Sequence, residues 1–440
     1  MKKPRLQVIT LGCSKNTVDT SHLLASAQEG YEIVPEAESD AKVDVLLINT
    51  CGFIGDAKEE SIQAIFDAVG RKKDGSVGKL LVFGCLSQRY MDELPGLIPE
   101  VDGWFGAREL APVLKALGVG PAPESARFVE GHPSYAFLKI SEGCDRRCSY
   151  CAIPLIRGRH RSVPMEVLEQ EARALAERGV RELILIAQDT TFYGLDLYRR
   201  RSLAELLRRL SSIPGIEWIR IHYSYPADFP EDVLDEMRNN PKLCKYLDIP
   251  LQHVADPVLG AMRRGVDMEW TKSLVKTIRA KVPGIVLRTT MMVGHPGEGR
   301  AEFEALLDFV REAKFERLGA FTYSEEEGTY GAANLRDSVT TRTKKSRLAR
   351  LMEVQRGISF AYNQTRVGET VKVLVDACTD DGILVCRSQF ESPEVDGEIL
   401  VKMTQQMGSD GSAMVGKFLD VKIVSADEYD LLGECQAVLE

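Results

Sequence analysis

Three cysteines fall within eight residues of the sequence EGCDRRCSYCAIP, at positions 144, 148 and 151. With spacings of four and three residues, one short loop can bring Cys144, Cys148 and Cys151 to different irons of one cluster. Three protein ligands leave one iron of a four-iron cluster open, as a catalytic metal site requires. The alternatives are buried thiols or a structural zinc site, but structural zinc needs four ligands and no further Cys or His occurs in the next eight residues. We therefore predict a catalytic cluster held by these three cysteines.

Several arginines lie close to this cysteine trio in the sequence. Their positive charge would offset the negative charge of a thiolate-ligated cluster and lower the pKa of the thiols. They are Arg146, Arg147, Arg157, Arg159 and Arg161.

Three other cysteines, Cys13, Cys51 and Cys85, are far apart in the sequence but share one local pattern. Each directly follows an apolar run, RLQVITLG, VDVLLINT or KLLVFG, and precedes a helical pattern or a loop. The carboxyl ends of parallel strands gather at one edge of an open α/β sheet, where ligands bind and helix N-termini favour thiolates. Small residues are also common in such turns, so a purely structural arrangement is the alternative. Because all three runs show the pattern, we favour a second metal or cluster site.

The elements that would position both cysteine sets are read from hydrophobic periodicity. The three apolar runs before Cys13, Cys51 and Cys85 alternate with amphipathic helical patterns, which indicates a parallel α/β sheet. From residue 135 on, six more runs alternate with helical patterns: AFLKIS, ELILIAQ, EWIRIHY, KYLDIP, IVLRTTMMVG and RLGAFTYS. About six β–α units over roughly 200 residues favour a closed or partial barrel with working residues at the carboxyl strand ends.

The last part of the chain has a different pattern. A basic, largely solvated helix is expected over residues 342–366, and after it come ETVKVLVDAC, GILVCRS, GEILVKM and KFLDVKIVSA, split by Gly-Asp turns. These short alternating segments predict a small antiparallel, OB-like β barrel. We therefore expect an α/β protein with an N-terminal sheet domain at 4–118, a linker at 119–133, a barrel core at 134–364 and a small β barrel at 365–436.

Composition places the chain among soluble globular proteins, with 440 residues of which 44% are hydrophobic and 28% charged. The start, MKKPRLQVITLGC, resembles neither a signal peptide nor a membrane span, so we expect a cytoplasmic protein without membrane partners. In that reducing compartment the ten cysteines are metal ligands, catalytic thiols or buried residues rather than disulfides. We assign a structural role to Cys244, Cys378, Cys386 and Cys435.

Charge is unevenly distributed along the chain. The net charge is −9, and residues 366–440 alone hold 6 Lys and Arg against 15 Asp and Glu, so the remainder is neutral. An acidic C-terminal module argues against phosphate binding there and fits a basic partner.

The Cys-x3-Cys-x2-Cys loop after a first barrel strand resembles the signature of the radical S-adenosylmethionine superfamily, and Tyr150 matches its aromatic before the last cysteine. The resemblance implies that Cys144, Cys148 and Cys151 hold a catalytic [4Fe-4S] cluster that binds and cleaves S-adenosylmethionine to a 5′-deoxyadenosyl radical. It also implies cofactor contacts at Tyr150, Gln188, Asp189, Gly294, Pro296, Gly297 and Glu298. A Gly-Pro-Gly stretch is first of all a turn, and His253 after the fourth barrel strand is more often a satisfied polar residue than a ligand.

The segments LGCSKNTVD, NTCGFI and FGCLSQRY, together with EGCDRRCSYCAIP, resemble the methylthiotransferases over essentially the whole chain. This resemblance implies a second [4Fe-4S] cluster on Cys13, Cys51 and Cys85 and a C-terminal substrate module called TRAM. S-adenosylmethionine would then be both methyl donor and radical source, with electrons from a low-potential donor such as flavodoxin or ferredoxin. A non-enzymatic two-cluster electron carrier is a less economical alternative, because carriers use four cysteines per cluster.

Two groups of methylthiotransferases compete as the identity of the chain. One modifies adenosine in transfer RNA, and the other modifies the β-carbon of an aspartate in ribosomal small-subunit protein twelve. The phrases LIAQDTTFYGLD, YLDIPLQH and FTYSEEEGTYGA resemble the protein-modifying group, and an acidic C-terminal module suits a basic ribosomal protein better than RNA. The sequence departs from the familiar pattern at His22, His295 and Gly299, which affects the detail of the adenosine contacts.

Overall fold

The computed structural model describes residues 2–131, 133–404, 407 and 411–439, and the chain divides into two compact units. The first unit comprises Met1–Val129, Ser141–Ala174 and Glu326–Ala333, and the second comprises Glu130–Ile140, Leu175–Glu325 and Asn334–Glu440. Residue 132 of the expected linker and residues 405–406 and 408–410 of the expected C-terminal module lie outside the described residues. Within the described residues, every helix is too short or too polar to cross a bilayer.

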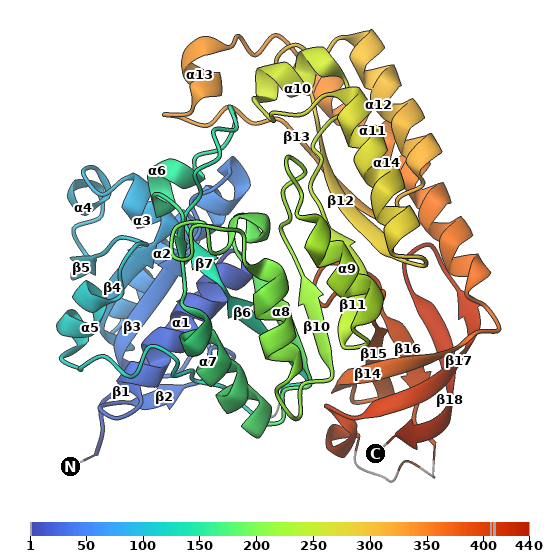
Figure 1. Ribbon diagram of the computed structural model, residues 1–440. Helices are drawn as coiled ribbons and strands as arrows, with labels where there is room; N and C mark the ends of the chain where they lie inside the picture. The colour runs from blue at the N-terminus through green and yellow to red at the C-terminus, as the bar shows by residue number, and fades with distance from the viewer. Residues whose placement is uncertain (1, 132, 405–406, 408–410, 440) are drawn as a thin grey trace. The chain divides into compact units, whose positions relative to one another are not determined.

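The first unit is built on a five-stranded parallel sheet with the strand order β2-β1-β3-β4-β5 (Figure 1). Its strands are β1 (Arg5–Thr10), β2 (Glu32–Val34), β3 (Val43–Thr50), β4 (Val77–Gly84) and β5 (Gly103–Trp104). Its helices are α1 (Ser14–Ala27), α2 (Gly55–Lys73), α3 (Cys85–Arg89), α4 (Leu94–Leu97) and α5 (Ala111–Leu117). The unit also contains the hairpin of β7 (Ser141–Glu142) and β8 (Arg161–Ser162), and α6 (Ile153–Arg157).

The central strands of this sheet are buried on both faces, which explains their continuous apolar sequence. In β3, Leu46 and Ile48 belong to one hydrophobic cluster, and Val45 and Leu47 belong to the cluster on the opposite face. Strand β4 divides its side chains between the same two clusters. The parallel sheet expected from the three apolar runs is confirmed.

The second unit contains an open, six-stranded parallel sheet with the order β13-β12-β11-β10-β9-β6. Its strands are β6 (Tyr135–Lys139), β9 (Glu182–Ile186), β10 (Trp218–Ile221), β11 (Leu243–Asp248), β12 (Val286–Val293) and β13 (Arg317–Thr322). The connecting helices, seen in Figure 1, are α7 (Met165–Glu177, which begins in the first unit), α8 (Leu203–Ser211), α9 (Glu231–Asn239), α10 (Asp256–Met262), α11 (Met268–Lys281) and α12 (Arg300–Ala313). Each of the six strands coincides with an expected apolar run, and the sheet stays open, as in a partial barrel.

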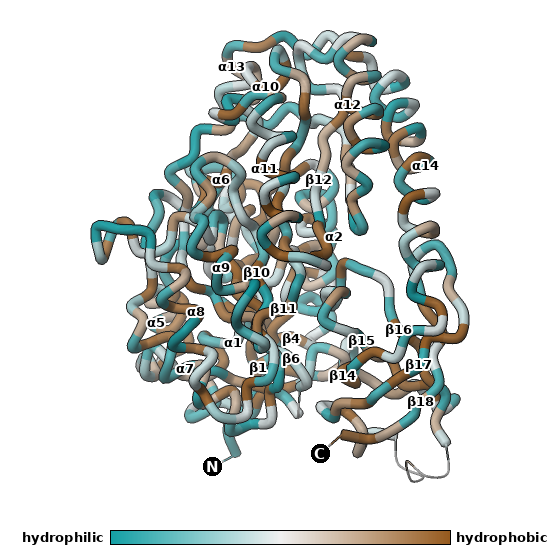
Figure 2. The backbone as a smooth tube through the Cα atoms, turned by 45° about the vertical axis from the view of Figure 1, so that its right-hand side comes forward, coloured by the Kyte–Doolittle hydropathy of each residue, from teal (hydrophilic) through white to brown (hydrophobic). Residues whose placement is uncertain are grey.

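Helix α13 (Tyr330–Asn334) and the 25-residue helix α14 (Thr341–Thr365) lead from β13 to a closed five-stranded barrel. The barrel strands are β14 (Thr370–Cys378), β15 (Ile383–Ser388), β16 (Ile399–Lys402), β17 (Phe418–Ala426) and β18 (Leu431–Leu439). Figure 2 shows hydrophobic stretches along these strands, and their buried side chains form one core.

The barrel is not antiparallel throughout, contrary to the sequence-based expectation. Four neighbouring pairs are antiparallel, whereas β16 and β18 are parallel. The physical reason is the odd number of strands, because strict up-and-down alternation around a closed ring of five leaves one pair pointing the same way. The closed architecture itself was expected, although β18 was not.

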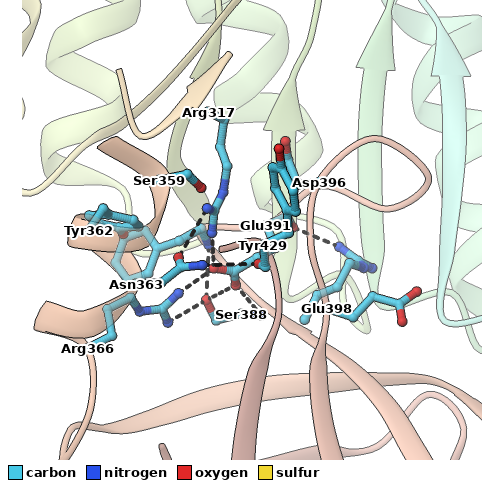
Figure 3. A network of polar contacts seen from close by, with 12 residues as sticks. Arg317, Ser359, Tyr362, Asn363, Arg366, Ser388, Glu391, Asp396, Glu398 and Tyr429 are labelled. Carbon is cyan, nitrogen blue, oxygen red and sulfur yellow. Dashed lines mark hydrogen bonds and ion pairs between the residues drawn. The ribbon is translucent and has the colours of Figure 1, made fainter. Parts of the chain in front are cut away.

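A buried network of charged side chains ties the β15–β16 segment to β13 and α14 (Figure 3). The Glu391 carboxylate accepts a hydrogen bond from Arg317 Nη2 at 3.1 Å, pairs with Arg366, and accepts from Ser388 Oγ at 2.5 Å. Burial on its own raises the pKa of Glu391, but the guanidinium groups of Arg366 and Arg317 outweigh it and bring the pKa to about 2. Glu391 is therefore ionised under all ordinary conditions.

The same network extends to residues of β9, β10 and β11 in the six-stranded sheet. Fully buried Glu182, the first residue of β9, accepts from Arg220 Nε and from Arg387 Nη1, each at 2.7 Å. Asp396 accepts from the Tyr246 hydroxyl at 2.7 Å. Hydrophobic contacts accompany these ion pairs, since the rings of Trp218 and Phe418 meet edge to face at 4.9 Å. Ion pairs and hydrophobic contacts together thus join the small barrel to the six-stranded sheet.

Candidate functional site

The three dispersed cysteines occupy the carboxyl ends of three neighbouring strands. Cys13 is the N-cap residue of α1 after β1, Cys51 directly follows β3, and Cys85 opens α3 after β4. The sheet order places β1, β3 and β4 side by side. The three thiols are close enough to influence one another electrostatically. Topology therefore gathers residues that are 72 positions apart in the sequence.

A glycine allows the first two strand ends to approach each other. Gly12 has φ +95°, and a Cβ atom built on it would lie 2.8 Å from Cys51 Cβ and 3.0 Å from Cys51 Sγ. Any larger residue would force Cys51 away or require a strained backbone. Gly12 therefore sets the spacing between the loops that carry Cys13 and Cys51.

The dispersed cysteines differ in their exposure. Cys13 is exposed, Cys51 is half-buried and Cys85 is buried. Burial raises the pKa of Cys51, and it raises the pKa of Cys85 to about 11 even though the nearby Arg157 guanidinium acts in the opposite direction. As free thiols both are protonated at neutral pH, so ligation of a metal there would release protons.

Arg157, the last residue of α6, reaches into this cysteine set. Its Nε donates to Cys85 Sγ at 3.4 Å, and its Nη1 pairs with Asp19 at 2.6 Å and with Glu142 at 3.1 Å. Its Nη2 donates to Asn16 Oδ1 at 2.6 Å. Burial opposes the charge of Arg157, but Asp19, Cys85 and Glu142 outweigh it and raise the pKa of the guanidinium.

The cysteine trio lies on the loop between β7 and α6, in the same unit as the dispersed set. Gly143, with φ +76°, lies directly against the carbonyl of Arg159, where a Cβ would come within 2.1 Å of the oxygen. The Cys144 amide donates to Gly158 O at 3.1 Å, and the Cys151 amide donates to Cys148 O at 3.2 Å. These bonds fold the loop back on itself, and all three thiols are half-buried and reduced.

The arginines that lie near the trio in the sequence differ in their exposure and in their contacts. Arg147 and Arg161 are exposed, and the 90% exposed side chain of Arg159 pairs with Asp145. The backbone amide of Arg146 donates a hydrogen bond to Cys144 Sγ at 3.4 Å. Arg157 contacts Cys85 of the dispersed set and Asn16, and the effect of the other arginines on the trio stays a prediction.

A segment remote in sequence also touches both cysteine-bearing regions. The buried Glu326 carboxylate binds Lys58 at 2.9 Å and Arg89 at 2.8 Å, and Arg89 also donates to the carbonyl of Gly52, the neighbour of Cys51. Farther along the same segment, the Gly331 amide donates to Ser149 O at 2.6 Å. No pattern in the sequence points to these contacts, because an acidic run such as EEE is usually a solvated loop.

The remaining predicted site residues, except half-buried Tyr150, lie in the second unit. Half-buried Gln188 and buried Asp189 follow β9, and Asp189 Oδ1 accepts from the Thr191 amide at 2.9 Å, capping the short helix Thr190–Phe192. Its carboxylate therefore shapes the loop after the strand.

The turn after β12 contains the other predicted cofactor residues, Gly294, Pro296, Gly297 and Glu298. The Glu298 carboxylate accepts from the Gly294 amide at 2.6 Å and from Arg347 Nη1 at 2.7 Å, so it closes the turn from inside. Gly294 (φ +78°) packs against the Lys344 side chain.

Two histidines line the same turn. His253 Nδ1 accepts from the Ala255 amide at 3.0 Å, and its Nε2 faces Glu298 at 3.6 Å. His295 is fully buried, and its ring meets Tyr323 edge to face at 4.9 Å. Both histidines are thus packed into the turn.

Among the described residues, no three His, Cys, Asp or Glu side chains converge closely enough to hold a single metal ion. A four-iron cluster does not require such convergence, because each thiolate binds a different iron. Both cysteine sets present three reduced sulfurs and no competing disulfide, a donor set that iron–sulfur clusters use.

Three family matches cover most of the chain. Residues 138–310 match the Radical SAM superfamily, residues 367–435 match the TRAM domain, and residues 5–106 match a family described as uncharacterized protein family UPF0004. Membership of the Radical SAM superfamily implies S-adenosylmethionine and a [4Fe-4S] cluster as cofactors.

Solved structures show the fold alone, because their sequence identity is low. The radical S-adenosylmethionine methyltransferase TsrM from Kitasatospora setae superimposes with a TM-score of 0.55 at 14% identity, covering 94% of this chain and 84% of that one. The cobalamin-dependent S-adenosylmethionine radical enzyme OxsB gives a TM-score of 0.52 at 12% identity, covering 81% and 56%.

Curated relatives match over their full length. The protein from Bacteroides fragilis is 48% identical over 99% of this chain and 100% of its own, and that from Porphyromonas gingivalis strain W83 is 49% identical over 98% and 99%. The protein from Flavobacterium johnsoniae is 47% identical over 99% and 98%. All three are named ribosomal protein uS12 methylthiotransferase RimO. The chain therefore belongs to the family of ribosomal protein uS12 methylthiotransferases RimO.

Proposed function

We propose that this protein adds a methylthio group to the β-carbon of an aspartate in ribosomal protein uS12. The observation that carries the proposal is the presence of two three-cysteine sets in one compact unit, in a chain that matches RimO relatives from end to end. A β-carbon hydrogen beside a carboxylate is not acidic, so polar acid–base chemistry alone is insufficient and radical chemistry suits the task.

Within this proposal, Cys144, Cys148 and Cys151 hold the cluster that binds S-adenosylmethionine, and Cys13, Cys51 and Cys85 hold a second [4Fe-4S] cluster. When bound, the two clusters and S-adenosylmethionine supply the one-electron and sulfur-transfer chemistry. The loop hydrogen bonds of the trio and the packing of Gly12 on Cys51 support these assignments, because they hold each set of thiols on rigid backbone.

The cofactor contacts are proposed at Tyr150, Gln188, Asp189 and the turn of Gly294, Pro296, Gly297 and Glu298. The side chains of Asp189 and Glu298 already bind backbone amides, so their part is to shape the surfaces that the methionine and adenosine ends would meet. Because glycines have no side chain, the backbone of the turn would allow S-adenosylmethionine to approach it closely.

The exposed charges of the C-terminal barrel support a basic protein as substrate. The segment from 366 to 439 exposes Lys372, Lys402, Lys417 and Lys422, whereas Arg366 and Arg387 are buried in ion pairs. Its exposed acidic residues are Glu369, Asp380, Asp381, Glu394, Glu398, Asp427, Glu428, Asp430 and Glu434. A ribosomal protein must be basic enough to bind RNA, so this surface would attract it and repel transfer RNA.

Domain roles follow the sequence-based division. We assign the second cluster to residues 4–118, the S-adenosylmethionine chemistry to 134–364 after a linker at 119–133, and substrate docking to 365–436. A low-potential flavodoxin or ferredoxin would deliver electrons, and the reaction would take place in the cytoplasm, where ribosomes assemble.

The deciding experiment offers reconstituted, dithionite-reduced enzyme with S-adenosylmethionine either uS12 or transfer RNA. Mass spectrometry should find the added methylthio group on a uS12 aspartate and none on the RNA. Modification of the RNA alone would establish the transfer-RNA alternative, and absence of 5′-deoxyadenosine would favour a plain electron carrier. As a control, Cys51→Ala should lower the iron content yet leave part of the S-adenosylmethionine cleavage.

A further inference from the structure

The nitrogens of the Arg157 guanidinium have acceptors of two kinds, oxygen and sulfur. The two terminal nitrogens take oxygen acceptors: Nη1 binds Asp19 and Glu142, and Nη2 binds Asn16. The remaining donor, Nε, points at Cys85 Sγ at 3.4 Å. A guanidinium is a rigid fork, so fixing its terminal nitrogens also fixes the direction of Nε.

The oxygen acceptors are themselves anchored to the cysteine-bearing strand ends. Asn16 Nδ2 donates to Leu11 O at 2.7 Å and to Thr50 O at 3.2 Å, close to Cys13 and Cys51 respectively. The orientation of Arg157 therefore depends on the ends of β1 and β3 as well as on α3. A buried arginine needs only a carboxylate partner to form an ion pair. Arg157 has such partners and, in addition, directs its charged Nε–H group at the sulfur of Cys85.

The apolar surroundings of Cys85 come from α6 and from Ala152, its N-cap residue. Ala152 and Ile156, both fully buried, pack with Cys85 in one small cluster. Water is thus kept from the Arg157–Cys85 contact, and in such surroundings a charge-assisted hydrogen bond is stronger than at the surface.

We propose that Arg157 is a positioning residue for the Cys13/Cys51/Cys85 set, whose hydrogen bond to Cys85 Sγ persists with the cluster bound and favours its reduced form. This rests on the second cluster of the proposed function. Reduction adds one electron from a low-potential donor, breaks no bond and makes the site more negative by one charge. A fixed positive charge stabilises the more negative form, and hydrogen bonds to sulfur tune cluster potentials in general.

The test uses the full chain with Cys144, Cys148 and Cys151 all replaced by Ala, so that iron can bind only at the dispersed set. After reconstitution, iron per chain is measured, and the midpoint potential is determined by a dithionite titration followed by electron paramagnetic resonance. In this background Arg157→Gln should make reduction at least about tenfold less favourable, a downward shift of about 59 mV for a one-electron couple.

Opposite charge changes separate an electrostatic role from a merely structural one. Asp19→Asn removes a negative charge next to Arg157 and should raise the potential, whereas Arg157→Lys keeps the charge without the fork and should fall between wild type and Arg157→Gln. Arg127→Gln is the matched control, because Arg127 is a similarly buried arginine of the same unit that pairs with Glu171 at 2.6 Å. It should leave the potential unchanged.

The outcomes distinguish the two proposals. Full iron and an unchanged potential in Arg157→Gln, or shifts of the same sign in Arg157→Gln and Asp19→Asn, would overturn the role of Arg157 and leave the second cluster intact. If Arg157→Gln fails to retain iron, the comparison of Arg157→Lys with Asp19→Asn decides in the same way. Absence of iron from the triple-alanine protein with Arg157 intact would instead overturn the second cluster itself.

Discussion

Buried arginines occur in both units of the molecule, but their partners differ. In the second unit Arg317 and Arg366 converge on one carboxylate, Glu391, in the network of Figure 3. In the first unit Arg157 pairs with carboxylates and also donates a hydrogen bond to the sulfur of Cys85. Buried charge alone therefore does not mark a functional site, and the identity of the acceptor atom is more informative.

Position in the fold separates the two regions as well. Glu182 and Arg317, two members of the ion network, are the first residues of β9 and β13 and so lie at the amino ends of these strands. Cys13, Cys51 and Cys85 follow the carboxyl ends of their strands. In α/β folds the carboxyl ends carry chemistry and the opposite ends carry stability. We interpret the ion network as the clamp between small barrel and sheet.

The largest expected effect comes from Cys148→Ala, which should abolish formation of 5′-deoxyadenosine. The iron content should fall by about half, because the other set of thiols keeps its four-iron cluster. Iron analysis combined with chromatography of the cleavage products measures both. Retained cleavage would refute the role of the trio, and Cys378→Ser, outside both sets, should change neither quantity.

Breaking the clamp should affect stability and leave the chemistry untouched. Glu391→Gln leaves two guanidinium groups buried without their carboxylate, so we expect a loss of roughly 3–5 kcal/mol in the free energy of unfolding. Urea titration followed by tryptophan fluorescence, to which Trp218 at this junction contributes, measures the loss. The exposed Glu369→Gln should cost under about 0.5 kcal/mol. Equal losses in the two variants would contradict the clamp.

The stabilisation by Glu391 should depend on pH in a defined window. Its pKa is about 2 in the folded protein against an ordinary value of 4.5, so its contribution is complete above pH 4.5 and is lost as the pH falls towards 2. The unfolding free energies of wild type and Glu391→Gln should therefore converge in acid. Parallel curves through that window would argue that Glu391 acts by packing alone.

Arg89 offers an intermediate case, a carboxylate-paired arginine in the cysteine-bearing unit. Because Lys58 still neutralises Glu326 after Arg89→Gln, the expected loss in the free energy of unfolding is smaller, roughly 1–3 kcal/mol. The potential of the dispersed-set cluster should shift by much less than in Arg157→Gln, because Arg89 donates to the Gly52 carbonyl and to Glu326 rather than to a sulfur. A potential shift as large as that of Arg157→Gln would show that acceptor identity is not what distinguishes the arginines.

The smallest effect is expected at His295, whose buried ring is kept neutral. Burial lowers its pKa to about 4, so between pH 6.5 and 4 the unfolded chain binds a proton that the folded chain does not. Stability should fall as the pH drops through this window, and His295→Phe should remove that loss, worth roughly 1–2 kcal/mol at pH 5. Unfolding free energies at pH 7.5 and 5 measure it; an equal acid dependence in both proteins would contradict the assignment.

Much of the fold could be predicted because long apolar runs are strong signals. Every strand expected from the sequence was found, whereas β2, β5, the short hairpin strands β7 and β8, and β18 were missed. Strands β2 and β5 are edge strands of only three and two residues, and β18, LLGECQAVL, interleaves polar residues because much of it is exposed. Its parallel pairing with β16 depends on barrel closure, which no local pattern encodes.

The site was predictable only where spacing carries the information. The six cysteines follow from strand ends and a short loop motif, but the partner of Arg157 does not, because Cys85 and Asp19 are 72 and 138 residues away from it. Likewise, the buried state of Glu326 arises from Lys58 and Arg89, which lie more than 230 residues earlier. Such contacts exist only after the chain has folded.

The short distance along the chain between Cys151 and Arg157, six positions, also bears on the order of metal loading. Ordering the trio by iron would restrict the helix that presents Arg157, and ordering Arg157 at Cys85 would in turn restrict the trio. By thermodynamic reciprocity, each site would raise the affinity of the other by the same factor. We therefore expect apo-protein titrated with iron and sulfide to fill cooperatively, with half-loaded molecules under-represented.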